Sequence, residues 1–247
     1  MAGLNKNYLV TGSSSGIGKA LTISLLSAGC NVLGIGRDSL KVKDIEQDYP
    51  DSFLFKSTDL AAQAQNSDVI EAFVAQYGKF NGMVYCAGKE ETMPIAMYTP
   101  EKLDNIFNVN FNAPFELLRL ISKKKTCEEM ASFVFLSSVM GELGQPGKTG
   151  YCSSKAALLG LVKAAALEFA QRKIRVNAVS PGVVDTPMSQ QLFNVVDEDN
   201  KRRIIDMHPL GIGKVEDVVP LITFLLSDES RWITGQNIKI DGGYSIQ

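Results

Sequence analysis

The chain has 247 residues, of which 45% are hydrophobic and 21% are charged, a composition that excludes an intrinsically disordered protein. Its 25 basic and 27 acidic residues give a formal charge of −2, which excludes a dedicated binder of nucleic acids or other polyanions. The length is compatible with a single α/β domain.

Short apolar runs alternate with longer amphipathic segments from one end of the chain to the other. The runs predict strands at residues 8–11, 31–36, 53–56, 82–86, 132–137, 175–180 and 236–240. Helical periodicity lies between them, at residues 16–28, 40–48, 66–77, 100–124, 150–172 and 215–227. Because alternating strands and helices form parallel sheets through right-handed crossovers, we predict one α/β domain over residues 1–247 with a doubly wound, mainly parallel sheet and helices on both faces.

The segment from residue 188 to residue 207 is less regular than the rest. Apolar Leu192, Phe193 and Val196 lie beside the charged residues 197–203. We predict a mobile flap over a site here, at about residues 187–210.

The cysteines and the histidine give little material for a metal site. Cys30, Cys86, Cys127 and Cys152 are far apart, without a C-x-x-C pair, so we expect reduced thiols in a cytoplasmic protein and no metal. His208 is the only histidine, and Pro209 after it favours a loop. No apolar run is long enough for a signal peptide or a transmembrane helix, and we expect neither.

Three glycines follow the first predicted strand directly and open the first predicted helix. Gly12, Gly16 and Gly18 have the spacing G-x-x-x-G-x-G. Glycines at such a turn let the backbone approach a pyrophosphate, and the helix N-terminus offers unpaired N–H groups to it. The turn therefore indicates a dinucleotide site, although a purely structural tight turn is the alternative.

The second predicted strand ends in a pair of charged residues that bears on the choice of dinucleotide. An acidic residue at this place binds a ribose 2′-hydroxyl, whereas an arginine accommodates the 2′-phosphate of NADP. Arg37 and Asp38 supply both types. A solvated pair, with Asp38 capping the next helix, is the alternative reading.

A tyrosine and a lysine stand one helical turn apart near the middle of the chain. Tyr151 and Lys155 share a helix face, and Ser138 follows the fifth predicted strand. A cation at about 4 Å contributes about 4 kcal/mol at an effective dielectric of about 20, which predicts a lowered pKa for Tyr151 and exchange of a proton with a substrate oxygen. Such pairs are also common on helix surfaces, so the indication depends on the glycine turn.

Taken together, these motifs make the chain resemble the short-chain dehydrogenase/reductase family, in its single-domain branch of about 250 residues, essentially from end to end. The resemblance rests on spaced matches at T-G-x-x-x-G-I-G (residues 11–18), Asp59, Ala87-Gly88, Asn110, Ser138, Tyr151-x-x-x-Lys155, Asn177, Pro181-Gly182, Thr186 and Asp241-Gly242-Gly243.

The resemblance implies a seven-stranded Rossmann-like sheet and an oxidoreductase acting on CH–OH or C=O groups. It makes Tyr151 the acid/base, has Ser138 orient the carbonyl, has Lys155 lower the tyrosine pKa and bind the ribose, and has Asn110 hold a relay water. Cofactor contacts are implied at Gly12, Ser14, Ser15, Gly16, Ile17, Gly18, Arg37, Asp59, Leu60, Ala87, Gly88, Tyr151, Lys155, Pro181, Gly182, Val183 and Thr186.

The chain departs from the family pattern in two places. The family's Asn-Asn-Ala-Gly is Tyr85-Cys86-Ala87-Gly88 here, which removes an asparagine side-chain tie, and Ser15 stands where NADP-preferring members often have Arg or Lys. In the family register, the ribose-binding aspartate of NAD enzymes falls at Gly36, and Arg37 matches the 2′-phosphate position. We therefore expect NADP, with NAD as the alternative, and carbonyl reduction in the cell.

The closest resemblance within the family is to 3-oxoacyl-acyl-carrier-protein reductases, so the substrate is a ketone, with a 3-oxoacyl thioester as one candidate. Those enzymes carry basic residues before the fifth strand to meet an acidic carrier protein, whereas Glu128 and Glu129 stand there in this chain. Arg172-Lys173 and residues 201–203 are candidate substitutes. A dehydrogenase of a sugar, polyol or steroid-like alcohol is one alternative function, and a catalytically silent nucleotide-binding scaffold is another.

The helix after Tyr151 is apolar on nearly all sides. One face can cover the sheet, so we expect the outer face to meet the same helix of another subunit in a homodimer or homotetramer. Coverage by local loops is the alternative.

Overall fold

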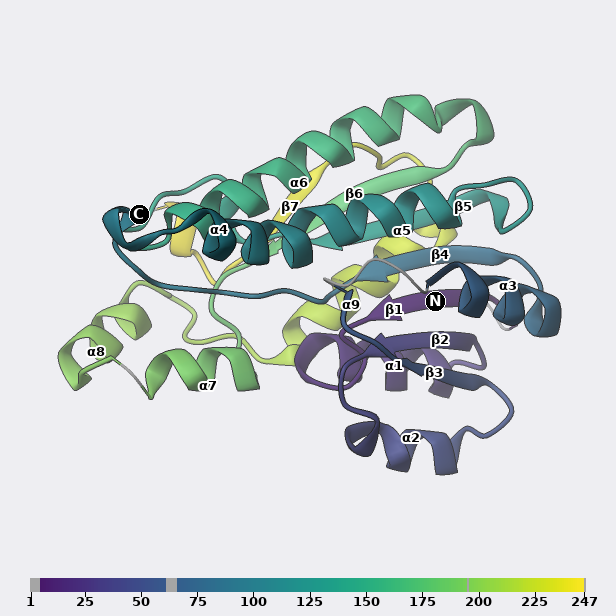
Figure 1. Ribbon diagram of the computed structural model, residues 1–247, viewed down its shortest axis with the longest axis horizontal. Coiled ribbons are helices and arrows are strands. Elements are labelled where there is room, and N and C mark those ends of the chain that lie inside the picture. Colours follow the sequence, from purple (N-terminus) through teal and green to yellow (C-terminus); the bar gives the residue numbers. More distant parts are fainter. Residues whose placement is uncertain (1–4, 61–65, 195, 247) are drawn as a thin grey trace.

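A computed structural model of the chain describes residues 5–60, 66–194 and 196–246 (Figure 1). Its centre is one seven-stranded sheet in the order β3-β2-β1-β4-β5-β6-β7, in which every pair of neighbours is parallel. This confirms the predicted doubly wound Rossmann-like fold. The strands are β1 (Asn7–Thr11), β2 (Asn31–Gly36), β3 (Phe53–Ser57), β4 (Phe80–Tyr85), β5 (Cys127–Leu136), β6 (Arg175–Pro181) and β7 (Asn237–Ile240).

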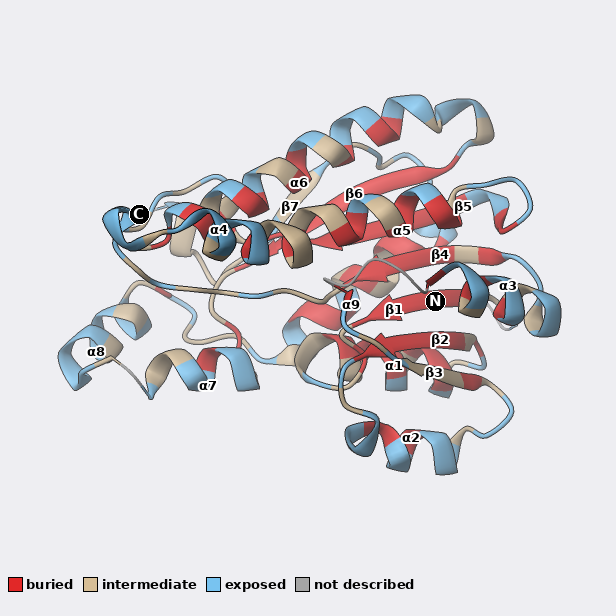
Figure 2. Ribbon diagram, viewed as in Figure 1, coloured by how far each residue is buried: buried red, intermediate tan, exposed pale blue. Residues whose placement is uncertain are grey.

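Helices cover both faces of the sheet, as Figure 1 shows. Each face has its own apolar core, and the central strands β2, β1, β4 and β6 and the second half of β5 are almost entirely buried, whereas the edge strands β3 and β7 are only partly buried (Figure 2). Strands buried on both faces read as continuous apolar runs, which is why the central strands were predictable. One layer holds α3 (Asn66–Tyr77), α4 (Pro100–Phe107), α5 (Ala113–Ile121) and α6 (Thr149–Glu168), and the other holds α1 (Gly16–Ser27) and α9 (Val215–Leu226), with α2 (Lys43–Asp48) beside β3.

β5 begins five residues earlier than predicted. Its register against β4 jumps from the pair Phe80–Cys127 to the pair Gly82–Ser132, so three more residues are used on β5 than on β4. The extra residues include exposed Met130, whose backbone φ is 63°. A bulge of this kind breaks the alternation of apolar residues on which a strand prediction depends.

The helix predicted at residues 100–124 is divided into α4 and α5. Between them lies η4 (Asn108–Asn112), a π-helical turn that contains the buried Asn110. Such turns insert one residue into a helix and occur mostly at functional sites. The insertion changes the direction in which Asn110 points without ending the helix.

The predicted flap contains two short helices, α7 (Pro187–Phe193) and α8 (Glu198–Asp206). Both extend away from the sheet (Figure 1), and no residue of α8 is buried. Thr186 caps α7 and Asp197 caps α8 by accepting hydrogen bonds from backbone N–H groups, which explains two helices in a segment with weak periodicity.

The outer face of α6 is open in the single chain. Leu158, Val162 and Ala165 are buried, whereas the side chain of Leu167 is 81% exposed and Gly160 has no neighbour within 4 Å of where its Cβ would stand. The described loops do not cover this face, so the alternative of coverage by local loops does not hold for them, and contact with a second subunit stays a prediction.

Candidate active site

The predicted site residues gather at the carboxyl ends of the parallel strands. β1 lies between β2 and β4, so the chain turns in opposite directions on either side of it. Ligands of doubly wound sheets bind at such a switch point. The glycine turn follows β1, Arg37 follows β2, Asp59 and Leu60 follow β3, and Ala87 and Gly88 follow β4.

The glycine turn leaves no room for side chains. Gly12 and Gly16 have backbone φ angles of 68° and 51°, which favour glycine. A Cβ on Gly18 would lie 2.3 Å from the carbonyl oxygen of Gly12, and a Cβ on Gly12 would lie 3.1 Å from the amide nitrogen of Ala87. Only backbone atoms therefore occupy these three glycine positions, directly before and in the first turn of the 12-residue helix α1. Backbone N–H groups at a helix N-terminus can bind a pyrophosphate, so the turn fits a dinucleotide.

Thr11 supplies the tie that the missing asparagine would have made. Its hydroxyl oxygen accepts hydrogen bonds from the amide N–H groups of Cys86 and Ala87, both at 3.1 Å. The side chain of Cys86 is enclosed, and burial raises the pKa of its thiol, so this cysteine is an inert packing residue. Sequence reasoning missed this role of Thr11, although the residue belongs to the glycine motif.

Arg37 and Asp38, which follow β2, have different surroundings. The carboxylate of Asp38 accepts a hydrogen bond from the backbone N–H of Leu40 at 3.0 Å and so caps the following 3-10 turn, as the alternative reading proposed. Arg37 is exposed. A Cβ on Gly36 would lie 2.9 Å from the hydroxyl oxygen of Ser14, so a side chain here would require Ser14 to move.

The contacts toward adenine are less defined. Leu60 is buried in the core, whereas Asp59 is exposed after β3. Asp59 is close enough to β4 that its charge contributes to the raised pKa of Tyr85.

Tyr151 lies in the first turn of α6 and is buried against Val139 and Met140, which follow β5. Ser138 lies close enough to the Tyr151 hydroxyl for its side chain to oppose the rise of the tyrosine pKa. The Ser138 hydroxyl oxygen also accepts the backbone N–H of Met140 at 3.2 Å, which fixes the serine at the end of β5. The structure thus brings the predicted tyrosine and serine together.

Lys155 lies on the same side of α6 as Tyr151, with its ammonium nitrogen 5.8 Å from the centre of the tyrosine ring. The ammonium donates a hydrogen bond to the carbonyl oxygen of Leu136 at 2.8 Å. Burial lowers the pKa of Lys155 to about 8, with Cys86 and Glu90 opposing the change. The lysine is therefore less reliably charged than the expected mechanism requires.

The predicted lowering of the Tyr151 pKa is wrong. Burial raises the pKa of Tyr151, the negative charge of Glu90 raises it further, and only the hydrogen bond with Ser138 opposes the change. The prediction considered only the attraction between the Lys155 ammonium and the Tyr151 phenolate. Burial removes both groups from water, and the resulting cost of a charged tyrosine is larger than this attraction.

Asn110 is held by the loop after β4. Its side-chain oxygen accepts the backbone N–H of Lys89 at 2.8 Å, and its amide nitrogen donates to the carbonyl oxygen of Lys89 and the hydroxyl of Ser154, both at 2.9 Å. A Cβ on Gly88 would lie 3.5 Å from the Lys155 ammonium and 3.6 Å from the Asn110 oxygen. Gly88 thus lies between the two predicted residues.

Pro181 ends β6, and Gly182, Val183 and Thr186 follow it; together they form the remaining wall. A Cβ on Gly16 would lie 3.2 Å from the Thr186 methyl carbon, which places this wall against the glycine turn. The backbone N–H of Val183 donates to Nε2 of His208 at 3.0 Å. The structure therefore assembles the glycine turn and the residues after β6 around one site.

Three residues near the site were not predicted to act there. Lys148 and Glu90 form an ion pair beside Tyr151, and His208 links Val183 to the carbonyl oxygen of Ile204 on α8, 2.7 Å from its Nδ1. Lys148 is the N-cap residue of α6, three residues before Tyr151, and this spacing could have indicated that it lies near the tyrosine. Nothing local in the sequence pairs it with Glu90.

Metal and membrane features were searched in the described residues. These residues contain no group of three or more His, Cys, Asp or Glu side chains that could hold a metal ion. No helix among residues 5–60, 66–194 and 196–246 is long and apolar enough to cross a membrane.

Comparison with known proteins agrees with this geometry. The chain matches, over residues 12–245, a family described as enoyl-(acyl carrier protein) reductase. It is 38% identical to a 3-oxoacyl-[acyl-carrier-protein] reductase FabG of Thermotoga maritima, with 98% of each chain covered, and 34% identical to the FabG of Rickettsia bellii, with 95% of each covered.

Solved structures give the same result. A short-chain type dehydrogenase/reductase from Mycobacterium ulcerans superposes with a TM-score of 0.88 at 28% identity, covering 99% of this chain and 91% of that one. The structure described as ElxO with NADP bound gives a TM-score of 0.87 at 29% identity, covering 98% and 99%. The chain therefore belongs to the short-chain dehydrogenase/reductase family and is an NAD(P)-dependent oxidoreductase that acts on CH–OH and C=O groups.

Proposed function

We propose that the protein reduces a ketone to a secondary alcohol with NADPH. The observation that carries the proposal is that Ser138 and Lys155 both lie beside Tyr151, the serine next to its hydroxyl and the lysine ammonium 5.8 Å from the ring centre. The two hydroxyls converge on one place where a carbonyl oxygen can accept from both. NADPH supplies the hydride for the carbonyl carbon.

The chain's own residues would then handle the proton. Ser138 donates a hydrogen bond that orients the carbonyl, and Tyr151 gives its hydroxyl proton to the oxygen as negative charge develops there. Lys155 stabilises the tyrosinate that remains. Asn110, fixed by Lys89 and Ser154, would position a water that returns a proton toward Lys155.

NADP as the cofactor is supported by the end of β2. Arg37 is exposed there, Asp38 is engaged as a cap, and Gly36 carries no carboxylate that could bind a ribose 2′-hydroxyl. The pyrophosphate would bind at Gly12, Ser14, Ser15, Gly16, Ile17 and Gly18, adenine at Asp59 and Leu60, and the nicotinamide end at Ala87, Gly88, Tyr151, Lys155, Pro181, Gly182, Val183 and Thr186.

The cofactor assignment is tested with Arg37→Ala. Loss of a charge-assisted hydrogen bond worth about 1.5–3 kcal/mol should weaken NADPH binding roughly 10- to 150-fold and leave NADH binding unchanged, as measured by fluorescence titration. Exposed Lys43, changed to Ala, is the matched control. Equal weakening for both cofactors, or none for NADPH, contradicts the assignment.

A 3-oxoacyl thioester is the first candidate substrate because the similar relatives from Thermotoga maritima and Rickettsia bellii are named for reducing one. The surface before β5 gives this candidate mixed support. A hollow of about 150 Å³ there is lined by Lys79, Lys124 and Arg172 together with Glu128 and Glu129. The guanidinium of Arg172 donates to the carbonyl oxygens of Ser122 and Cys127, so this arginine is committed to the fold and is a poor substitute for a carrier-binding residue.

The substrate class is tested by following NADPH and NADH oxidation at 340 nm with acetoacetyl-coenzyme A, an apolar diketone and a keto sugar. Turnover of the thioester with NADPH supports the first candidate. Turnover of only the keto sugar, or oxidation of a polyol or steroid alcohol with NAD, supports the alternative dehydrogenase. Cofactor binding without any turnover supports the silent scaffold.

We further propose that the protein forms a homodimer or homotetramer through the open face of α6. Ala156, Gly160 and exposed Leu167 lie on that face and would pack against the same helix of a second copy. Light scattering on Leu167→Glu tests this, since a smaller species is expected. The cytosol is the proposed location, supported by the thiol form of the cysteines.

A further inference from the structure

Lys148 and Glu90 form an ion pair that touches the tyrosine of the proposed acid/base site. The Lys148 ammonium contacts Oε1 of Glu90, and the two side chains are only 7% and 19% exposed. The same ammonium lies 6.0 Å from the centre of the Tyr151 ring, compared with 5.8 Å for Lys155. Two lysines therefore stand at nearly the same distance from the tyrosine, but only Lys148 has a carboxylate partner.

The pair is held in place by backbone. The carbonyl oxygen of Lys148 accepts the N–H of Cys152 at 2.8 Å, which makes Lys148 part of the first turn of α6. On the other side, the backbone N–H of Met93 donates to the carbonyl oxygen of Gly147 at 2.8 Å, so the loop after β4 is fixed against the start of α6. Glu90 also follows Lys89, whose backbone N–H donates to the Asn110 side-chain oxygen and whose carbonyl oxygen accepts from the Asn110 amide nitrogen.

A buried charge is costly unless it is paired, so Glu90 and Lys148 depend on each other. Their fields at Tyr151 oppose each other, since the carboxylate disfavours tyrosinate and the ammonium favours it. Other charged or titratable groups near the tyrosine are Lys155 and Cys152 on α6, Cys86 after β4 and Tyr244 at the C-terminal end.

We propose that Glu90 and Lys148 are positioning residues that together set the protonation of Tyr151, with Lys148 opposing the carboxylate that favours the protonated tyrosine. This inference rests on the proposed acid/base role of Tyr151. Burial and Glu90 both raise the pKa of Tyr151, which agrees with the direction expected of the carboxylate.

The test places 3,5-difluorotyrosine at position 151 and follows its ¹⁹F resonance through a pH titration. The fluorine atoms lower the intrinsic pKa of the phenol, which brings the titration into an accessible range without any substrate. Lys148→Met leaves the carboxylate unopposed and should raise the pKa of residue 151 by about one unit, whereas Glu90→Gln should lower it by a similar amount. The double variant should fall between the two.

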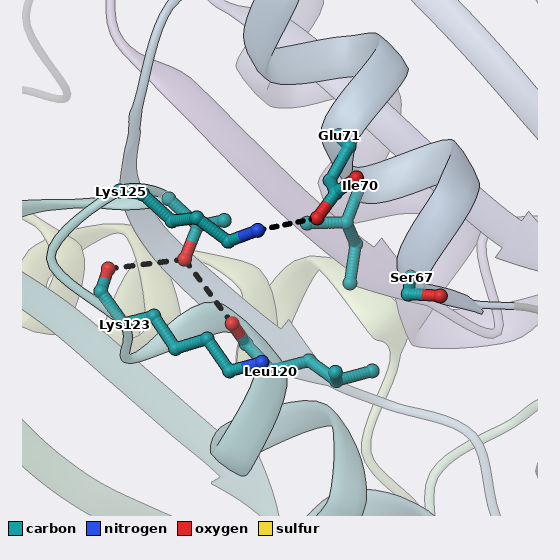
Figure 3. Close-up of a pocket in the computed structure, with 7 residues that line it drawn as sticks. Ser67, Ile70, Glu71, Leu120, Lys123 and Lys125 are labelled. Atoms are coloured by element: carbon teal, nitrogen blue, oxygen red, sulfur yellow. Dashed lines mark hydrogen bonds and ion pairs between the residues drawn. The ribbon is translucent and has the colours of Figure 1, made fainter.

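Lys148→Arg keeps the charge and should stay close to the unsubstituted protein. The control pair is Lys125 and Glu71, whose ammonium and carboxylate are 2.5 Å apart on the surface before β5 (Figure 3). Lys125→Met and Glu71→Gln should not move the titration. If Lys148→Met does not fold, the other two variants still test the inference. Glu90→Gln should lower the pKa of residue 151, and Lys148→Arg should leave it unchanged.

Shifts of the same sign in Lys148→Met and Glu90→Gln, or shifts no larger than those of the control pair, overturn the inference. The titration needs no turnover, so it stays informative if the proposed ketone reduction fails. If the unsubstituted protein reduces no carbonyl but the predicted titration shifts are observed, the proposed function is rejected and the charge arrangement is kept.

Discussion

The ammonium of Lys155 lies 5.8 Å from the ring centre of Tyr151 and is itself buried, so the two groups share one dry environment. The environment disfavours charge on each of them. Burial raises the pKa of the tyrosine, which keeps it protonated at pH 7, and lowers the pKa of the lysine to about 8, so that the lysine is still mostly charged at pH 7 but at a cost in free energy. Burial of the charged Lys155 therefore lowers the free energy of unfolding at neutral pH, and this effect can be measured.

Replacing Lys155 by Met should stabilise the protein at neutral pH. The folded-state pKa of about 8 lies below the ordinary value of 10.5, so the unfolded chain binds more protons between these two values and the wild-type protein gains stability as pH rises through them. The variant should have a free energy of unfolding higher by about 2–4 kcal/mol at pH 7. Urea unfolding from pH 7 to 10.5 should show this advantage shrinking, and a constant or growing difference contradicts the prediction.

Asn110→Ala should cost both stability and activity. It removes three hydrogen bonds, with the backbone N–H and carbonyl oxygen of Lys89 and with the hydroxyl of Ser154, and a hydrogen bond is worth about 0.5–1.5 kcal/mol. Chemical denaturation should show a loss of about 2–4 kcal/mol. Asn112→Ala, which removes one hydrogen bond to Asn108, is the matched control and should lose less than about 1.5 kcal/mol. Equal losses would mean that the loop after β4 does not depend on Asn110.

Gly18→Ala should disrupt the turn that is proposed to bind pyrophosphate. The added Cβ would stand 2.3 Å from the carbonyl oxygen of Gly12, so the backbone must move. We expect a destabilisation of more than about 2 kcal/mol and loss of NADPH binding by calorimetry. Gly144→Ala has open space and should change stability by less than about 0.5 kcal/mol. Retained NADPH affinity in Gly18→Ala would contradict the role of the turn.

His208 should be neutral with its proton on Nδ1. The Val183 backbone N–H can only donate, so Nε2 of the histidine must accept and Nδ1 must donate to the carbonyl oxygen of Ile204. Since His208 is the only histidine, a ¹⁵N correlation spectrum at pH 7.5 reports this tautomer without assignment. The other tautomer would mean that the Val183 bond is absent. His208→Ala should cost about 2 kcal/mol because both bonds are lost.

The sequence was informative where local patterns decide the structure. Strand–helix alternation predicted the sheet, and the glycine spacing placed the turn between β1 and α1. β2 was predicted at its observed bounds because it is a short apolar run between turn residues.

Prediction failed where long-range packing decides. The bulge in β5, the π-helical turn at Asn110 and the caps that form α7 and α8 each depend on contacts or single hydrogen bonds that leave no periodic trace. The same holds at the site, because Glu90 meets Lys148 across 58 residues and its effect on Tyr151 depends on burial. A spacing of four residues predicted that Tyr151 and Lys155 are neighbours, but not how dry their surroundings are.

The central claim is that the Tyr151 hydroxyl transfers the proton during carbonyl reduction, and Tyr151→Phe tests it most directly. Initial rates of NADPH oxidation with acetoacetyl-coenzyme A, or with whichever carbonyl of the panel is turned over, should give a kcat/KM at least about 100-fold lower than that of the wild-type protein. NADPH affinity should be nearly unchanged, and Tyr49→Phe, remote on the surface with its hydroxyl 2.8 Å from that of Ser27, should keep full activity. Full activity in Tyr151→Phe would contradict the account.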